Sequence, residues 1–484
     1  MISRRNVLAL GVLSAAAAAA PLERLVLSPT SATANAATSS PPIPLFDRAL
    51  TVPPVLRPRR LGSVDYYDIT MRTTDVELLP GATSNLWTYG GESPGPVIKA
   101  VAGRPVIVQQ RNQLPEPAAV HLHGGNVPSA SDGLPGDEIQ PGGSRRYLYP
   151  NRQPAATLYY HDHVHHLESP HTYRGLTGLY LLTDRAEQRL CLPTGKYDVP
   201  LVLQDRLFNA DGSLRMPGPR DIVGDVTLVN GRPTPVLEVE QRPYRFRLLN
   251  GSSLDGIQQL SLGDGEQFQV IASDGGLLSA PVAVNGLTLS PSERYEIVID
   301  FSKYPIGTQL ELRNSLVATG LSPHVMRFDV TQRATSAFGP VGKRLVPVPR
   351  LREAVATVRR EFVFQFNQAA TQMEINGKAF DPNRIDIKPR LGDTEIWTVR
   401  NADQSPPIPH VFHTHLVRFQ VLDRDGKPAG PLEAGWKDSI LINPGESVRL
   451  IMRFGDFTGR YLYHCHLLGH ADLGMMAQME VVRR

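Results

Sequence analysis

Short apolar segments bounded by turn residues recur three times along the chain. Each copy is a turn, an apolar stretch and an asparagine nine positions further on, at residues 103–112, 241–250 and 392–401. A glycine turn precedes each copy, at 90–91, 230–231 and 376–377, and a turn that opens another strand follows it, at 140–143, 290–293 and 443–446. Apolar runs of this length between frequent turns predict β-strands. Three copies of one β-sandwich domain are the simplest account of the repeat.

The composition supports an all-β protein of several domains. The chain has 484 residues, which is too long for one ordinary domain, and its 42 prolines and 41 glycines divide it into short segments. The composition loosens at 190–198 and at 339–352, where we place the linkers. We therefore predict three domains, at 45–190, 191–340 and 350–484.

The charge balance argues against two classes of partner. Lys and Arg total 50 and Asp and Glu total 47, so that positive and negative charges nearly cancel. A protein without a strong field has little affinity for nucleic acid or for an anionic membrane surface. We expect neither nucleic acid nor a membrane surface as a partner.

The first 36 residues resemble a targeting segment. Residues 3–8 read Ser-Arg-Arg-Asn-Val-Leu, a twin-arginine pattern, and the apolar run at 7–20 is shorter than a membrane-spanning helix requires. We predict a twin-arginine signal peptide over 1–36, cleaved near Ala36, with a Sec signal or a retained anchor as the alternatives. The prediction implies the twin-arginine export machinery as a partner, no stable membrane anchor, and a periplasmic or extracellular location.

Histidines fall on the repeat in a regular way. Eight of the fourteen form four H-x-H pairs: His121 and His123, His161 and His163, His413 and His415, His464 and His466. The first and third copies each have one pair after Asn112 or Asn401 and a second pair that begins twenty residues after Pro141 or Pro444. The middle copy has Glu311 at the position twenty residues after Pro291. Since an H-x-H strand turns both rings to one face, four pairs that meet between domains one and three would offer eight imidazoles. Eight imidazoles suit several copper ions better than one zinc ion, whose sites close at four ligands.

A second group of donors surrounds the last pair. Cys465 lies between His464 and His466, and alternation along a strand can turn its sulfur to the face opposite both rings. His410, His470 and Met475 would complete a site with one thiolate, two imidazoles and a weak thioether, the ligands of a blue-copper centre. Cys191 would then be a lone thiol, which we expect to be buried and inert. The remaining histidines match no repeat position and are not expected to bind copper: His165, His166, His171 and His324.

Four motifs occur in order: H-L-H-G at 121–124, H-D-H at 161–163, H-x-x-H-x-H at 410–415 and H-C-H-x-x-x-H-x-x-x-x-M at 464–475. With these motifs the chain resembles the three-domain multicopper oxidases. The sequence at 160–163, 173–176 and 419–423 most resembles bacterial laccases of the spore-coat and bilirubin-oxidase type. The resemblance implies an all-β fold of three consecutive cupredoxin-like Greek-key β-sandwich domains, with the type 1 copper in the third.

The resemblance also implies four copper ions as cofactors. The type 1 ligands would be His410, Cys465, His470 and Met475. The type 2 ligands would be His121 and His413, and the type 3 pair would be held by His123, His161, His163, His415, His464 and His466. Substrate would be oxidised one electron at a time at the type 1 centre, with His470 as the entry point. Electrons would pass through Cys465 to the cluster, which reduces dioxygen to water.

Oxygen reduction consumes protons, so acidic residues are expected near the cluster. Asp132 matches the acidic residue that the family has after H-L-H-G, although an Asp before Gly133 is also an ordinary turn residue. Spore-coat laccases usually have a second acid directly after the last histidine, where this chain has Ala471. Whether Asp472 replaces it is left open by the sequence.

We therefore expect an oxidase of phenols or aromatic amines that uses dioxygen. An oxidase of cuprous or ferrous ion is a second possibility, although 9 methionines leave no room for the Met-rich insertion common in copper-efflux oxidases. A biosynthetic o-aminophenol oxidase would share every copper ligand. Cupredoxin-like structural or cell-division proteins lack these ligands, and copper nitrite reductases have fewer histidines.

Overall fold

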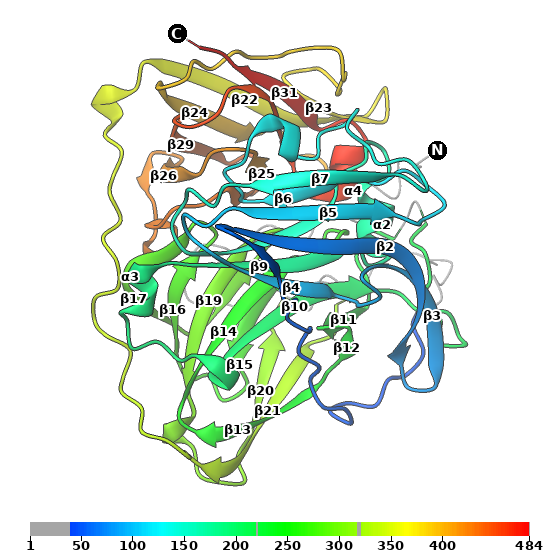
Figure 1. Ribbon diagram of the computed structural model, residues 1–484, viewed down its shortest axis with the longest axis vertical. Coiled ribbons are helices and arrows are strands. Elements are labelled where there is room, and N and C mark those ends of the chain that lie inside the picture. The colour runs from blue at the N-terminus through cyan, green and yellow to red at the C-terminus, as the bar shows by residue number, and fades with distance from the viewer. Residues whose placement is uncertain (1–38, 219–220, 317–320, 484) are drawn as a thin grey trace.

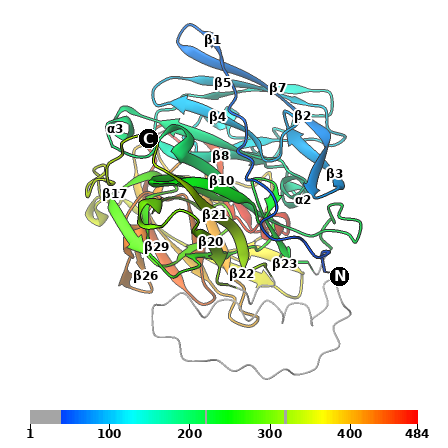
Figure 2. The same cartoon turned by 90° about the horizontal axis from the view of Figure 1, so that it is seen from below.

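The computed structural model describes residues 39–218, 221–316 and 321–483. The signal peptide predicted over 1–36 lies outside this part of the chain. Within it the strands form six sheets, two in each of three domains, and each domain contacts the other two (Figures 1 and 2). In the same residues no helix is both long enough and apolar enough to cross a membrane.

Domain 1 pairs a five-stranded with a four-stranded sheet. The larger sheet contains β1 (Arg59–Leu61), β2 (Val64–Leu79), β3 (Ala82–Tyr89), β5 (Val106–Asn112) and β7 (Ser144–Tyr149). The smaller sheet contains β4 (Gly95–Val101), β9 (Thr177–Thr183), β8 (Ala156–Asp162) and β6 (Val120–His123). Apolar side chains of both sheets, such as Val108 and Leu158, share one buried core, so the domain is a sandwich.

Domain 2 repeats this plan with larger sheets. One contains β12 (Arg232–Pro233), β11 (Val226–Val229), β10 (Asp198–Arg206), β14 (Pro243–Asn250), β19 (Arg294–Asp300), β16 (Phe268–Ser273) and β17 (Gly276–Val284). The other contains β13 (Val236–Gln241), β21 (His324–Arg333), β20 (Gln309–Asn314), β15 (Gln258–Leu262) and β18 (Leu287–Leu289). Phe246 and Phe328, one from each sheet, meet in the core.

Domain 3 contains the C-terminal sandwich, yellow to red in Figure 1. Its six-stranded sheet contains β23 (Gln372–Ile375), β22 (Val358–Asn367), β24 (Thr394–Asn401), β29 (Ser447–Arg453), β26 (Phe419–Arg424) and β27 (Lys427–Pro428). Its four-stranded sheet contains β28 (Ser439–Ile442), β25 (His410–Thr414), β30 (Gly459–Cys465) and β31 (Met476–Val481).

The helices are short and lie at the ends of strands. They are α2 (Glu168–Tyr173), α3 (Arg185–Gln188) and α4 (Leu468–Asp472), with one-turn 3-10 helices η2 (Ser129–Ser131), η3 (Gly195–Tyr197), η4 (Phe301–Lys303), η6 (Glu353–Val355) and η7 (Pro431–Glu433). Helix α2 of domain 1 lies against α4 of domain 3 and forms one of the contacts between these domains.

The predicted threefold repeat is confirmed by the strand pairing. The strands β5, β14 and β24 end at Asn112, Asn250 and Asn401. Each pairs in parallel with a preceding strand, β2, β10 or β22, and antiparallel with a following one, β7, β19 or β29. The fold class is therefore three β-sandwich domains, as predicted, and the boundaries at 190 and 340 to 350 stay a prediction.

The asparagine of each copy has the same structural task. All three are fully buried. In domain 2 the side-chain amide of Asn250 donates to the carbonyls of Gly256 (2.8 Å) and Leu289 (2.9 Å), and its oxygen accepts from the Ser252 N–H (3.1 Å). Asn112 and Asn401 make equivalent sets of three bonds. The asparagine thus ties two loops to the end of its strand and supplies partners for otherwise unpaired buried backbone groups.

The environment of Cys191 differs from the prediction. We expected a buried thiol, but Cys191 is exposed. It lies in the connection between α3 and η3, where the adjacent Leu192 fills the apolar position and packs with Ile271 and Ala272. The expectation was wrong because one apolar residue is enough to anchor this short linker.

Replacing the repeated asparagine should destabilise the protein strongly. For Asn250→Ala we expect a loss of about 3 kcal/mol in the free energy of unfolding, because three hydrogen bonds of about 1 kcal/mol each disappear. Urea denaturation followed by circular dichroism would measure it. Asn285→Ala is the matched control, since Asn285 is exposed and also binds a backbone carbonyl, that of Gly265. Equal changes for the two variants would contradict the structural role of Asn250.

Candidate metal centres

The eight paired histidines form one buried cluster between domains 1 and 3. In the small sheet of domain 1, β6 and β8 place His121 opposite His161. In that of domain 3, β25 and β30 place His413 opposite His464. Rings then stack across the domain boundary, with ring centroids 3.7 Å apart for His121 on His415 and for His123 on His413. The pairs that the sequence predicted to meet are therefore brought together.

One nitrogen of most rings is held by an acceptor outside the cluster. His121 Nδ1 lies 2.8 Å from the carbonyl oxygen of Asp132, and His413 Nδ1 lies 2.7 Å from that of Asp438. His161 and His464 use the carbonyls of Asp162 and Cys465 in the same way, both at 2.9 Å. Histidines that bind a metal usually donate their other N–H to such acceptors, which fixes the tautomer and the ring orientation.

The opposite nitrogens point toward one another. Those without a hydrogen-bond partner among the described residues are His121 Nε2, His123 Nδ1, His161 Nε2, His163 Nδ1, His413 Nε2 and His466 Nδ1. His163 Nε2 and His415 Nε2 each lie 3.4 Å from His464 Nε2. Donor atoms of several triplets lie within 4.8 Å of one another: His121, His123 and His161; His121, His413 and His415; His163, His415 and His464. Buried polar atoms without partners are unfavourable, and metal ions would satisfy them.

Burial favours the neutral form of seven of the eight cluster imidazoles. Burial, reinforced by neighbouring histidines, lowers the pKa well below the usual value for His123, His161, His163, His413, His415 and His466. Burial lowers the pKa of His464 to about 4. Neutral imidazole is the form that binds metals, so the residues present fit a set of copper ions.

A second donor set lies on the other face of β30. Cys465 Sγ is 3.7 Å from His410 Nδ1 and 3.6 Å from His470 Nδ1, and these nitrogens are 3.3 Å apart. His410 Nε2 lies 2.9 Å from a carboxylate oxygen of Asp403. Met475 is buried in the same core, and its carbonyl accepts the Cys465 N–H at 3.0 Å. Three of the four predicted donors, His410, Cys465 and His470, are therefore brought together, with His464 and His466 turned to the opposite face.

Without a metal ion, the buried Cys465 thiol keeps its proton. Burial raises the pKa of the Cys465 thiol to about 12. A bound metal ion would replace the proton and stabilise the thiolate, which is further supported by the Val411 N–H that donates to Sγ at 3.4 Å. Two imidazoles beside a soft sulfur are the donors expected for copper.

Asp132 lies directly beside the cluster. It follows η2, is fully buried, and its carboxylate oxygen is 2.6 Å from His415 Nδ1. Burial raises the pKa of this carboxyl above its ordinary value. Asp132 is thus more than a turn residue, because its carbonyl and its carboxylate hold one histidine each.

Glu168 was missed by the sequence reasoning. It begins α2, is fully buried, and its Oε1 lies 3.7 Å from His161 Nδ1 and 3.6 Å from His163 Nε2. Neither carboxylate oxygen has a hydrogen-bond partner in the described part of the chain, and burial raises the pKa of Glu168 well above its usual value. Glu168 lies outside the repeat, and the only signal was an acid five residues after H-D-H.

Asp472 does not replace the acid that is missing at Ala471, because its carboxylate is directed to the start of α2. Its carboxylate accepts the backbone N–H groups of Glu168 (3.2 Å) and Ser169 (3.0 Å), and therefore holds the start of α2. Burial raises the pKa of Asp472 to about 6. Helices α4 and α2 thereby fix Glu168 in place.

The four other histidines have ordinary partners. His171 is buried between Asp162 (2.9 Å) and Glu116 (3.3 Å), and His324 pairs with Glu311 (2.9 Å). His165 and His166 pack their rings on each other.

The copper-free protein should lose stability as the pH falls from about 6.5 toward about 4. An unfolded chain binds protons on histidine near pH 6.5, whereas buried His464 binds one only near pH 4. The contribution of neutral His464 to the free energy of unfolding is present above the pKa of the unfolded chain and is lost as the pH falls. For this histidine the loss is about 3 kcal/mol. Urea midpoints across this range would show the loss, and His464→Gln should reduce it. An equal slope in both proteins would contradict the interpretation.

Comparison with known proteins gives one consistent family. Models of the multicopper oxidase family match residues 70–187, 188–324 and 355–484. The chain is 36% identical to a laccase of Bacillus subtilis (strain 168), with 90% of this chain and 98% of the relative covered. It is also 36% identical to a bilirubin oxidase of Albifimbria verrucaria, with 90% and 81% covered.

The structural comparison agrees. The crystal structure of a multi-copper oxidase from Pediococcus acidilactici superposes with a TM-score of 0.85 at 33% identity, covering 93% of this chain and 95% of that one. The resemblance stated from the motifs is therefore confirmed. The chain belongs to the multicopper oxidase family and is an oxidoreductase that uses dioxygen as its electron acceptor.

Proposed function

We propose that the protein is a laccase-like oxidase that takes single electrons from phenols or aromatic amines and binds four copper ions. The observation that carries the proposal is the division of the tripeptide 464–466 between two sites. Cys465 faces His410 and His470, whereas the histidines on either side of it face the eight-histidine cluster. A covalent path of a few bonds therefore joins the two centres.

The residues that would hold copper are those brought together by the fold. His410, Cys465, His470 and Met475 would hold one ion, and His121 and His413 a second. His123, His161, His163, His415, His464 and His466 would hold a pair. When bound, copper supplies one-electron redox chemistry at the first site and the reduction of dioxygen to water at the cluster.

His470 is positioned to contact the substrate. Of the four residues of the thiolate site, the other three are completely buried and His470 is 6% exposed. Asp255 of domain 2 has a carboxylate oxygen 3.8 Å from His470 Nε2. A phenol or aromatic amine that reached the imidazole edge would find an acceptor for its O–H or N–H there.

Asp132 and Glu168 are proposed to hold the protons that oxygen reduction consumes. Asp132 holds one beside His415, and Glu168 holds one beside His161 and His163. Glu168 thus provides an acid next to the cluster, although the position after the last histidine is occupied by Ala471. Both carboxyls are buried, which favours their protonated form.

Oxidation of a metal ion is the second candidate. Asp255 is partly buried near the fully buried Asp205, and the burial of Asp255 together with the charge of Asp205 raises the pKa of Asp255 to about 7. A carboxylate beside His470 would also suit ferrous ion. A dedicated o-aminophenol oxidase would use the same Asp255 carboxylate as the hydrogen-bond acceptor for its substrate.

Export by the twin-arginine route is proposed from the motif at residues 3–8. Replacing Arg4 and Arg5 together by lysine should retain the protein in the cytoplasm of an expressing bacterium. Unchanged export of that variant would overturn this part of the proposal.

Copper loading should produce an intense blue colour and oxygen uptake with a phenol. Cys465→Ser should remove both the thiolate-to-copper absorption and the uptake, because the soft sulfur is lost. His324→Gln is the control, since His324 pairs with Glu311 in domain 2 and should leave both unchanged. A colourless loaded protein would overturn the central assignment, and uptake with ferrous or cuprous ion alone would favour the second candidate.

Glu168→Gln should slow oxygen uptake by roughly 10²-fold while the blue absorption persists, because the amide cannot donate the proton that a carboxylic acid does. Stopped-flow reoxidation of the reduced, copper-loaded protein would measure the step directly. Glu374→Gln is a matched control, because Glu374 is also buried but bonds only to Gln365 and Asn367 in the contacts described for it. A reoxidation rate of Glu168→Gln equal to that of the control would exclude the proton role.

A further inference from the structure

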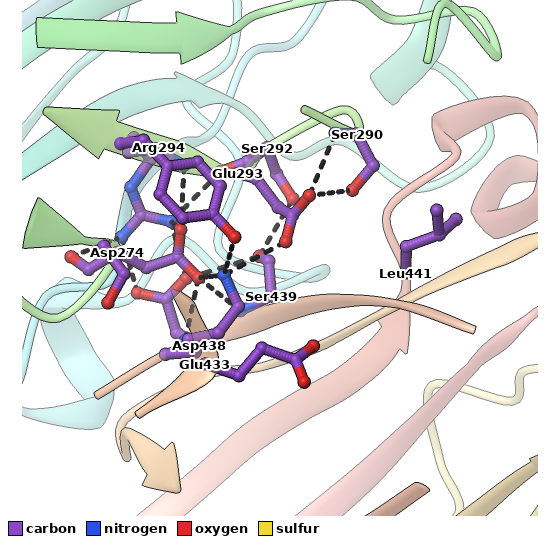
Figure 3. Close-up of polar contacts among 12 residues, drawn as sticks. Asp274, Ser290, Ser292, Glu293, Arg294, Glu433, Asp438, Ser439 and Leu441 are labelled. Atoms are coloured by element: carbon purple, nitrogen blue, oxygen red, sulfur yellow. Dashed lines mark hydrogen bonds and ion pairs between the residues drawn. The ribbon is translucent and has the colours of Figure 1, made fainter. Parts of the chain in front are cut away.

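Domain 2 supplies none of the proposed copper ligands, yet its Arg294 binds Asp438 of domain 3, a residue that contacts the cluster (Figure 3). Arg294 is the first residue of β19 and is fully buried. Each of its five side-chain N–H groups has an acceptor. Nε donates to the Thr157 carbonyl, and the two terminal nitrogens donate to the carbonyls of Ser292 and Asp274 and to both carboxylate oxygens of Asp438. A guanidinium with all donors used has a fixed position.

Asp438 lies between this arginine and the histidines. Its carboxylate receives the two bonds from Arg294 at 2.6 Å each. The same carboxylate lies 3.1 Å from His123 Nε2, and the backbone carbonyl of Asp438 lies 2.7 Å from His413 Nδ1. Asp438 therefore holds both rings of the His123–His413 stack by the nitrogens that face away from the cluster.

Asp132 has the same relation to the other stack. Its carbonyl accepts from His121 and its carboxylate from His415. The two aspartates thus hold the two stacks by the same pair of groups. They differ in one respect: Asp438 is gripped by Arg294, whereas the ion pairs of Asp132 in the described residues are with histidines only.

Further buried charges surround the arginine. Lys437 Nζ lies 3.0 Å from both Asp274 and Glu293, and Asp274 also accepts the Arg294 backbone N–H at 2.8 Å. Three carboxylates, those of Asp438, Asp274 and Glu293, thus face two cations, Arg294 and Lys437. Buried carboxylates in such a network are favourable only while cations are held beside them.

We propose that Arg294 is a positioning residue of the copper cluster. It holds Asp438, which orients His123 and His413, and so makes the ligand-free middle domain part of the metal site. The inference rests on the proposed ligand assignment. A purely structural role, in which Arg294 only joins domains 2 and 3, would leave copper binding unchanged.

Arg245 distinguishes these roles. Arg245 is also buried in domain 2. It donates to the carboxylate of Glu296, which lies on β19 as Arg294 does, and to that of Glu187. The contacts described for Arg245 include none of the proposed ligands. Arg245→Lys should therefore lower the urea midpoint without changing the copper centres.

The test uses the full chain loaded with copper, as Arg294→Lys, Asp438→Asn, the double variant and Arg245→Lys. We expect the first three to bind copper at the cluster roughly 10- to 100-fold more weakly, the effect usual for a lost partner of a ligating histidine. The electron paramagnetic resonance signal of the type 2 copper should change, whereas the blue absorption should remain. The double variant should bind copper no more weakly than the single variant of lower affinity, because both substitutions remove the same support.

Retention of full copper and an unchanged type 2 signal in Arg294→Lys, with only the loss of stability seen for Arg245→Lys, would overturn the inference. Should Arg294→Lys not fold, Asp438→Asn is nearly isosteric and decides alone: a changed type 2 signal supports the inference and an unchanged one overturns it. Absence of copper binding by the unsubstituted protein would instead refute the proposed function.

Discussion

Eight imidazoles can share one buried space only while they are neutral and while each ring is held in place. Burial favours the first condition, since it lowers the pKa of seven of the eight cluster histidines. Acceptors outside the cluster supply the second for most rings, because they take one N–H and leave the opposite lone pair directed inward. Without metal, this arrangement leaves unpaired polar atoms in the protein interior. Most of the architecture between domains 1 and 3 can be understood as support for this unfavourable group of side chains.

The alternation of side chains along β30 explains how two different sites share one strand. His464 and His466 face the cluster, while Cys465 faces the core of domain 3, where the donors His410 and His470 lie. A shift of one residue in strand register would exchange the two faces and destroy both sites. The register of β30 is fixed by its pairing with β25 and β31 and by the apolar core of domain 3. The same packing therefore determines which metal donors face each site.

The features that repeat could be predicted from the sequence, and those that depend on contacts between domains could not. Strand periodicity and the fixed distance from proline to histidine located β5, β14, β24 and the ligand pairs. Glu168 carries no such signal, because it lies outside the repeat, on a helix whose start is held by Asp472 of domain 3. Asp438 and Arg294 each look like ordinary residues at a strand end, and only the packing of domain 2 against domain 3 brings them together. Cys191 was misjudged because composition does not tell which residue of a linker faces solvent.

The middle domain shows why a domain without ligands can still be required. Its Arg294 binds Asp438, which contacts the cluster, and its Asp255 has a carboxylate oxygen 3.8 Å from His470 Nε2 of the thiolate site. Both residues carry charge to places where domains 1 and 3 alone would leave a buried carboxylate or an imidazole edge without a partner. Charged groups act strongly at such short range in a poorly solvated interior. The placement of domain 2 therefore sets the electrostatic surroundings of both centres, although every proposed donor atom comes from the other two domains.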